Sequence, residues 1–290
     1  MFFEQLLNGL TMGAIYALIA LGYSMVYGIL QIINFAHGDI FMLGTFIALT
    51  LIKVLHVPFA GAFVIAMVIT AMIGIIIERL AYRPLRMADR MAPLLSALGV
   101  SIFLANFAQL IWGTETHPFP KVVNIANIKL GEVNINNLQV YILLMSIVLM
   151  IILQLIVKKS SWGVAMRATS YHKDHARLMG INVDKVISLT FAVGSALAAA
   201  AGIMVGLYYD AVYPTMGYSA GLKAFTAAVL GGIGSIPGAM LGGLVLGVFE
   251  NFGAAYLSSG YRDAIAFSIL IIVLLVKPSG LLGKSHQQKV

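Results

Sequence analysis

The sequence predicts an all-α polytopic membrane protein with about eight transmembrane helices. Of its 290 residues, 60% are hydrophobic and only 10% are charged, whereas soluble domains are roughly half apolar and a quarter charged. The apolar residues form successive runs, most of them near the ~20 residues that a membrane-spanning helix needs, and basic residues cluster between the runs. A soluble chain this apolar would aggregate, so a soluble enzyme, a nucleic-acid-binding protein and a disordered chain are disfavoured.

The expected spans follow from the apolar runs in chain order. The first run, from Gln5 to about Ile33, exceeds one untilted span and is broken at residues 34–39. Later runs cover residues 40–55, 58–77, 93–112, 139–157, 186–208 and 263–276, and a glycine-rich zone lies at residues 223–251. Broken or re-entrant segments are therefore expected near residues 34–39 and 231–238, within a single transmembrane domain formed by residues 1–290.

The distribution of basic residues predicts the orientation of the chain, because cytoplasmic loops carry an excess of Lys and Arg. Thirteen of the 18 Lys and Arg lie in residues 78–91, 158–185 and 277–290. We expect these segments, and with them the C-terminus, to lie in the cytoplasm. Counting back across three spans places the N-terminus outside, and the polar segment 113–138 forms an external loop. The net charge of +7 is thus explained by orientation.

The polar break at residues 34–39 has two interpretations. Asn34 can cap the end of one helix, and Asp39 can lie in the first turn of the next, where the helix dipole favours an anion. Alternatively, this hinge lines or gates a passage, because ionisable groups within a membrane are costly and usually functional. The candidate residues on the second interpretation are Asn34, Phe35, His37, Gly38 and Asp39.

A second break is expected in the glycine-rich zone. Gly231, Gly232 and Gly234 lower the helix propensity, and Pro237 removes a backbone donor. Irregular backbone at membrane depth persists where it lines a cavity or is buried in protein, so this break is a candidate for the transport path. The later glycines, from Gly238 onward, have the spacing that lets helices pack closely, which favours a structural role for them.

Two polar residues, Glu250 and Asn251, interrupt an otherwise apolar helix near the end of this zone. Either a place on the path or a hydrogen bond between helices explains them. Together with the hinge residues and with Gly231, Gly232 and Gly234, they complete the set of pathway candidates.

Two further patterns resemble sites but do not support one. Residues 280–285 look like the end of a phosphate-binding loop, but Pro278 stands where the first glycine is required. His172 and His175 lack a third ligand nearby, so solvated polar residues explain them better than a metal site does. We expect no catalytic residues, no bound metal and no enzymatic activity.

The basic segment 158–185 has the pattern of a short amphipathic helix with a turn at residues 180–182. Apolar residues around Val164 precede a charged patch, and a second apolar group follows around Leu178. An isolated helix this short is marginal in water and needs a surface on which to pack. That surface is either the lipid headgroup layer or a cytoplasmic partner protein.

Three separated segments of the sequence carry family motifs. They are residues 33–39 (Ile-Asn-Phe-Ala-His-Gly-Asp), residues 167–182 and the glycine pattern of residues 231–243. In this order they resemble the LivH-type permeases of ATP-binding-cassette importers for branched-chain amino acids. The core of the second segment departs from the maltose-type pattern, because His175 stands where Ala is usual. Permeases for urea typically have Met where this chain has Phe35, which favours Leu, Ile and Val as substrates.

The resemblance implies a multi-pass subunit of a bacterial inner membrane that forms the translocation path. It would pair with a second, homologous permease and with two cytoplasmic ATPase subunits, which would bind ATP and Mg²⁺, and a periplasmic solute-binding protein would deliver the substrate. No cofactor is expected on this chain. The residues implied in coupling to the ATPase are Arg167, Ala168, Asp174, Ala176, Gly180 and Ile181.

Two other functions are compatible with the sequence. A permease of the same family would carry urea, short amides or another small amino acid. A stand-alone secondary transporter or channel would need a coupling-ion site within the spans, for which only Asp39 and Glu250 are candidates. Uptake by this chain alone, without ATP, distinguishes the last function from that of an importer permease.

Overall fold

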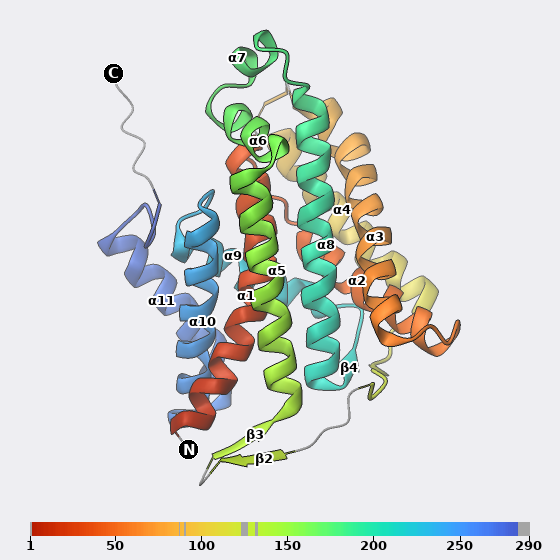
Figure 1. Ribbon diagram of the computed structural model, residues 1–290, viewed down its shortest axis with the longest axis vertical. Coiled ribbons are helices and arrows are strands. Elements are labelled where there is room, and N and C mark those ends of the chain that lie inside the picture. Colours follow the sequence, from red (N-terminus) through yellow and green to blue (C-terminus); the bar gives the residue numbers. More distant parts are fainter. Residues whose placement is uncertain (1, 87, 90, 123–126, 131–132, 284–290) are drawn as a thin grey trace.

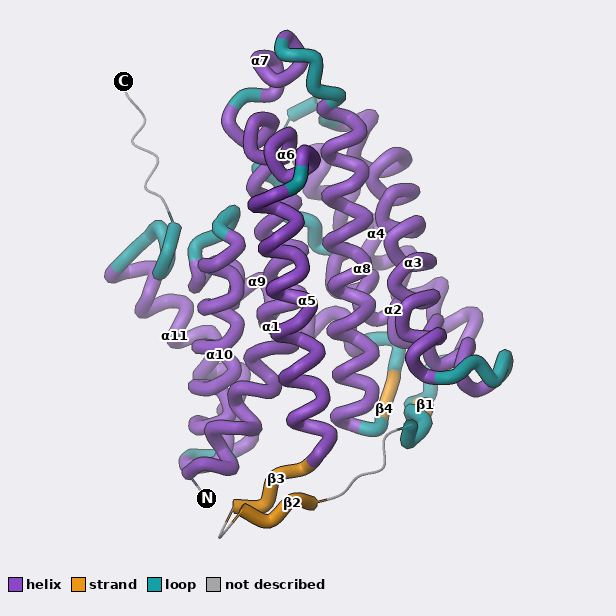
Figure 2. The backbone as a smooth tube through the Cα atoms, viewed as in Figure 1, coloured by secondary structure: helices purple, strands orange, loops and turns teal. Residues whose placement is uncertain are grey.

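The computed structural model describes residues 2–86, 88–89, 91–122, 127–130 and 133–283. This part of the chain is a bundle of helices with short strands toward one end (Figures 1 and 2). The all-α polytopic fold expected from the sequence is thus confirmed. In chain order the α-helices are α1 (Phe2–Leu30), α2 (His37–Lys53), α3 (Phe59–Ile77), α4 (Met91–Trp112), α5 (Asn137–Lys159), α6 (Ser161–Tyr171), α7 (Lys173–Leu178), α8 (Val183–Tyr209), α9 (Met216–Gly231), α10 (Ile236–Tyr256) and α11 (Arg262–Val276).

Short elements complete the fold. They are a π-helical turn (Glu78–Tyr82) and a 3-10 turn (Arg83–Leu85) after α3, a 3-10 turn (Ser259–Tyr261) before α11, and the strands β1 (His117–Pro118), β2 (Asn127–Leu130), β3 (Val133–Asn136) and β4 (Ala211–Val212). β1 pairs antiparallel with β4, and β2 pairs antiparallel with β3. The β1–β4 pair ties the loop before α5 to the segment that follows α8.

Seven helical segments of the described chain are long and apolar enough to cross a membrane, and they contain α1, α3, α4, α5, α8, α10 and α11. The core lies around α1 and α8, whose most apolar windows are 89% and 83% buried. The corresponding windows of α4 and α11 are only 17% and 6% buried. Their apolar side chains face outward, as lipid-facing helices require.

Two further helices are too short to span a membrane. α2 has 17 residues and α9 has 16, or about 25 Å at 1.5 Å per residue, whereas the hydrocarbon core is about 30 Å thick. Their first turns meet at Gly38 and Gly217. A Cβ atom on Gly38 would lie 2.2 Å from the carbonyl oxygen of Gly217, and one on Gly217 would lie 2.5 Å from that of Gly38. Only glycine at both positions allows this contact.

The two halves of the chain repeat one arrangement in opposite directions. In each half a long buried helix, α1 or α8, precedes a non-helical segment, residues 31–36 or 210–215, and then a short helix, α2 or α9. α1 begins at the end of the bundle where the N-terminus lies, whereas α8 begins at the opposite end, next to α7 (Figure 1). Each short helix therefore starts inside the bundle and runs outward, away from the other.

Two of the basic segments lie at one end of the bundle. Arg83 and Arg86 form ion pairs with Asp184 at 2.6 and 2.5 Å, so the segment after α3 is adjacent to the start of α8. At the opposite end, the rings of Phe2 and Phe252 lie 5.2 Å apart. The N-terminus and the first basic segment therefore lie at opposite ends of the bundle (Figure 1).

The segment after α11 returns to the turn between α9 and α10. The backbone N–H groups of Leu281 and Leu282 donate to the carbonyls of Leu230 and Gly231, both at 2.9 Å. The same turn lies against Gly28, near the end of α1. Residues 281–283 therefore lie at the end of the bundle opposite the N-terminus. Three basic residues, Arg90, Lys284 and Lys289, lie outside the described residues.

The later glycines of the glycine-rich zone bring α10 against α1. A Cβ atom on Gly247 would lie 2.2 Å from the backbone nitrogen of Gly13, and one on Gly243 would lie 2.4 Å from that of Ala17. Such distances exclude any side chain without a shift of the backbone. The structural role predicted for these glycines is therefore confirmed.

Candidate functional site

The segment expected to dock a partner forms two short helices, α6 and α7, which project from one end of the bundle (Figure 1). The sequence pattern predicts one helix, but the backbone of His172 is extended and ends α6. Nδ1 of His172 then accepts a hydrogen bond from the N–H of His175 at 3.4 Å and caps α7. The predicted turn is present, because Gly180 has a φ of +81°.

The tip of this projection is apolar and uncovered by the described chain. Leu178 and Met179 are 84% and 82% exposed. Ala176 is buried beneath them, and its carbonyl accepts a hydrogen bond from the N–H of Ile181 at 3.0 Å, which closes the turn. Adjacent apolar side chains at such an exposed tip are typical of a surface that another molecule covers.

Two other coupling candidates, Arg167 and Asp174, have different structural roles. Arg167 donates to the carbonyl of Val157 and thereby anchors α6 to the end of α5. Asp174 is exposed and forms an ion pair with Arg177 at 3.3 Å. Arg167 therefore holds the projection in place, whereas Asp174 is available at its surface.

A cluster of charged side chains joins the end of α3 to the start of α8. Glu78 is fully buried, and its carboxylate accepts hydrogen bonds from Arg86 and, at 2.5 Å, from the hydroxyl of Ser188. Arg86 also pairs with Asp184 at 2.5 Å. Removing one partner of a buried ion pair typically costs about 3–5 kcal/mol, so this cluster firmly couples the two helices.

Helix α7 lies within electrostatic range of this cluster. Burial lowers the pKa of the Lys173 ammonium below its ordinary value, and the positive charges of Arg86 and Arg177 lower that pKa further. The charge on Lys173 is therefore felt at Arg86.

The π-helical turn connects the charge cluster to the hinge. Its first residue is Glu78, and its last residue, Tyr82, is buried and donates its hydroxyl to Oδ1 of Asn34 at 2.7 Å. π-Helical turns are rare and occur frequently at functional sites. One helical turn thus links a buried ion pair at the end of the bundle to a polar residue in the break between α1 and α2.

At the hinge, the capping interpretation is wrong for Asn34, whereas Asp39 lies at its predicted position. The break covers residues 31–36, and Asn34 lies within it. The side chain of Asn34 bonds Tyr82 and caps neither helix, so capping does not explain this residue. Asp39 lies in the first turn of α2, as predicted, and its carboxylate accepts a hydrogen bond from Ser101 of α4 at 2.5 Å.

Aromatic and glycine contacts place the hinge between the two halves of the chain. The ring of His37 lies 4.7 Å from that of Tyr23, in space that Gly22 leaves open, since a Cβ atom there would lie 2.3 Å from Nε2 of His37. The ring of Phe35 lies 6.4 Å from that of Phe225 on α9. With the contact between the first turns of α2 and α9, these residues bring the hinge candidates together.

The glycine-rich break is a packed turn between α9 and α10. Gly232 and Gly234 have φ values of +104° and +89°, which favour glycine. A Cβ atom on Gly231 would lie 1.9 Å from the carbonyl oxygen of Gly238, and the hydroxyl of Ser235 caps α10 by accepting from the N–H of Gly238 at 3.2 Å. The predicted interruption is therefore present and is buried in protein.

Glu250 and Asn251 form contacts between helices. Nδ2 of Asn251 donates to the backbone carbonyl and to Oε1 of Gln5, at 2.8 and 2.7 Å. The carboxylate of Glu250 pairs with Lys223 of α9 at 2.8 Å, and Lys223 also pairs with Asp263 of α11 at 2.8 Å. The interpretation as interhelical contacts holds for both residues, and they tie α10 to α1, α9 and α11.

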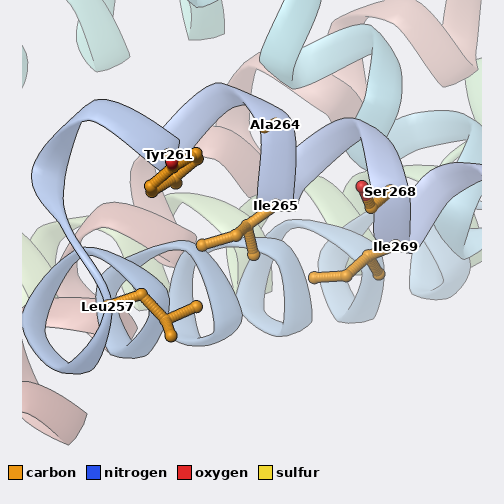
Figure 3. Close-up of a pocket in the computed structure, with 6 residues that line it drawn as sticks. All are labelled: Leu257, Tyr261, Ala264, Ile265, Ser268 and Ile269. Atoms are coloured by element: carbon orange, nitrogen blue, oxygen red, sulfur yellow. The ribbon is translucent and has the colours of Figure 1, made fainter.

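An apolar groove of about 470 Å³ lies between the end of α10 and α11 (Figure 3). Its lining residues are Leu257, Tyr261, Ala264, Ile265, Ser268 and Ile269. None of the pathway or coupling candidates lines it. Because α11 is largely exposed, this groove lies on the lipid-facing surface of the bundle.

The residues that join the docking end to the hinge were not singled out from the sequence. They are Glu78, Tyr82, Arg86, Asp184 and Ser188. One signal does point to Glu78, because it is a lone acidic residue at the end of a long apolar run. The bond between Tyr82 and Asn34 joins residues 48 positions apart and leaves no local pattern.

Comparison with known proteins identifies close relatives. Residues 5–274 match the family described as branched-chain amino acid transport system / permease component. The chain is 44% identical to the high-affinity branched-chain amino acid transport system permease protein LivH of Escherichia coli (strain K12), over all of this chain and 98% of the relative. It is 46% identical, with the same coverage, to the corresponding protein BraD of Pseudomonas aeruginosa.

Among solved structures, the chain resembles PsaBC from Streptococcus pneumoniae in complex with Fab. The TM-score is 0.51 and the sequence identity is 14%, and the match covers 96% of this chain and 93% of that chain. This similarity concerns the fold alone.

Proposed function

Because the chain belongs to the family of branched-chain amino acid transport system permease components, we propose that it forms the translocation path for Leu, Ile and Val in an importer driven by separate ATPase subunits. The observation that carries this proposal is the 44–46% identity to such permeases over the full length of the chain. The chain itself acts as a transport subunit and not as an enzyme. ATP and Mg²⁺ are bound by the partner ATPases.

The proposed complex contains two ATPase subunits, a second, homologous permease and a solute-binding protein. The ATPase docks on α6 and α7, where Leu178 and Met179 offer exposed apolar side chains. This end of the bundle faces the cytoplasm, since it carries the basic segments. The solute-binding protein delivers the amino acid at the opposite end, where the N-terminus and the described part of the loop 113–138 lie.

Coupling between ATP and the path runs, in this proposal, from α7 to the hinge. Closure of the ATPase dimer displaces α7 and alters the potential at the pair of Arg86 and Glu78. The π-helical turn transmits the change to Tyr82 and Asn34, and the hinge between the two short helices switches. Such coupling needs a packing with two discrete states that both sites bias, and the contact between α2 and α9 is the proposed bistable element.

The path itself is proposed to pass the hinge residues Asn34, Phe35, His37, Gly38 and Asp39. They lie where the oppositely directed halves meet. Broken helices that end inside a bundle are typical of transport pathways. Gly231, Gly232 and Gly234 form the turn at the cytoplasmic side, and Glu250 and Asn251 hold α10 in position.

Reconstitution tests the proposed function. Liposomes that contain this chain, the homologous permease and both ATPases should accumulate radiolabelled leucine when ATP is enclosed and the solute-binding protein is outside. Liposomes with this chain alone should not. Uptake of leucine by the single chain without ATP would instead establish a secondary transporter, and uptake of urea without leucine would contradict the proposed substrate class.

A further inference from the structure

A second groove, of about 330 Å³, lies at the basic end of the bundle, where α3 ends and α8 begins. Its walls include three cations, one carboxylate and two apolar residues. They are Arg79, Arg83, Lys185, Asp184, Ile75 and Leu189. None of the pathway or coupling candidates predicted from the sequence lines this groove, but Asp184 and Ser188 of the charge cluster do. The groove is therefore adjacent to the proposed coupling route and separate from the hinge.

The groove carries an excess of positive charge. Its carboxylate, Asp184, is already held by Arg83 at 2.6 Å and by Arg86 at 2.5 Å. Arg79 and Lys185 are exposed and form no ion pair within the described part of the chain. Two cations are therefore free to bind an anion, and Arg83 offers the part of its guanidinium that Asp184 does not use.

One side of the groove is apolar and lies toward the membrane-spanning segments α3 and α8. Ile75 and Leu189 lie toward the spans, one helical turn from the cations, and Leu189 is 38% exposed. Ile76 and Leu80, next to the groove on the same segment, are 53% and 75% exposed. The groove thus lies at the level where acyl chains give way to headgroups, with apolar surface below and cations above.

We propose that this groove binds the headgroup phosphate of an anionic glycerophospholipid from the adjacent leaflet. Arginine matches the geometry of phosphate oxygens, and basic pockets between membrane helices are suited to anionic headgroups. The exposed apolar residues accommodate the first part of the acyl chains. A zwitterionic headgroup fits less well, because its ammonium group meets the same cations.

Bound lipid would also act on the charge cluster. Arg83 is shared between the groove and Asp184, so a phosphate that engages Arg83 weakens its hold on Asp184 and leaves Arg86 as the main partner of that carboxylate. The lipid would therefore adjust the link between α3 and α8. The binding itself is independent of which substrate the chain carries.

Lipid titration of the purified full-length chain in detergent tests this proposal. The unfolding temperature is measured against phosphatidylglycerol, phosphatidylcholine and inorganic phosphate. Phosphatidylglycerol should stabilise the wild-type chain at much lower concentrations than the other two. The double variant Arg79→Gln/Lys185→Gln should need roughly thirtyfold more phosphatidylglycerol for half of the effect.

The matched control is Lys158→Gln/Lys159→Gln, which removes the same charge at the end of α5 on the same side of the molecule. It should retain the wild-type response, and so should the charge-conserving pair Arg79→Lys/Lys185→Arg. Equal weakening in both glutamine variants would show a general attraction to the basic end and would overturn the proposal. Stabilisation by inorganic phosphate at the same concentrations would identify a site for free anions and would overturn the lipid assignment.

Discussion

The hydroxyl of Tyr82 forms a hydrogen bond that joins the π-helical turn to the hinge. It donates to Asn34 at 2.7 Å, and both side chains are buried. Leaving a buried acceptor without its donor typically lowers the free energy of unfolding by about 1–3 kcal/mol. One hydroxyl can be removed here without changing the packing of the ring. A single substitution at Tyr82 therefore tests the proposed coupling route directly.

Replacing Tyr82 with Phe should lower the stability of the purified chain by about 1–3 kcal/mol and should reduce ATP-driven uptake severalfold. The physical reason is that Oδ1 of Asn34 loses its donor while the ring contact with Phe191 remains. Thermal unfolding and leucine uptake measure the two effects.

Tyr141→Phe is the matched control for this substitution, because the hydroxyl of Tyr141 makes no hydrogen bond within the described part of the chain. It should change neither stability nor uptake. Combining Tyr82→Phe with Asn34→Ala should cost less than the sum of the two changes. Additive losses would show that the two residues act separately.

At the scale of elements, α7 and the turn after it form the part that meets the ATPase in the proposed complex. Gly180 ends α7 with a φ of +81°, and a Cβ atom there would meet nothing within 4 Å. The strain of a substitution at this position therefore comes from the backbone and not from packing. Gly113, at the end of α4, has a φ of +86° and equally open surroundings.

Gly180→Ala should reduce the stimulation of ATPase activity by the loaded solute-binding protein in the reconstituted complex. The left-handed backbone costs a non-glycine residue about 1–2 kcal/mol, which shifts the turn that presents Leu178 and Met179. Gly113→Ala carries the same strain after α4, away from α7, and should leave the stimulation intact. Similar losses in both variants would indicate general destabilisation, and normal stimulation in Gly180→Ala would contradict the docking role.

The all-α class and most of the spans could be predicted because apolar runs and clustered charges are local patterns. The sequence predicts about eight spans, whereas seven helical segments of the described chain are long enough to cross a membrane. The run at residues 40–55 forms α2, which is too short to be a span. Breaks were predicted near residues 34–39 and 231–238, because asparagine, glycine and proline signal them directly. In the structure the non-helical segments are residues 31–36 and 232–235, and residues 37–39 already belong to α2. The separation of α6 from α7 was missed, because it depends on the cap that His172 provides. Caps of this kind act within three residues and do not alter the apolar pattern.

At the scale of the whole molecule, the repeat in opposite directions could not be predicted. It depends on the contact of Gly38 with Gly217, and each glycine in isolation is equally consistent with a turn or with ordinary packing. The charge cluster was missed for the same reason, since Glu78 and Asp184 come together only when α3 lies beside α8. The scarce polar residues of an apolar chain acquire their roles from tertiary contacts.

In the proposed mechanism, ATP binding by the ATPase docked on α6 and α7 moves the hinge between the two short helices. The chain contains no cysteine, so Ile33→Cys introduces a unique thiol in the break between α1 and α2. The most direct test is the rate at which a thiol reagent labels this cysteine in a reconstituted complex with cysteine-free partners. The labelling rate should change when ATP is added and should recover after hydrolysis. An unchanged rate in a complex that still transports leucine would contradict this mechanism.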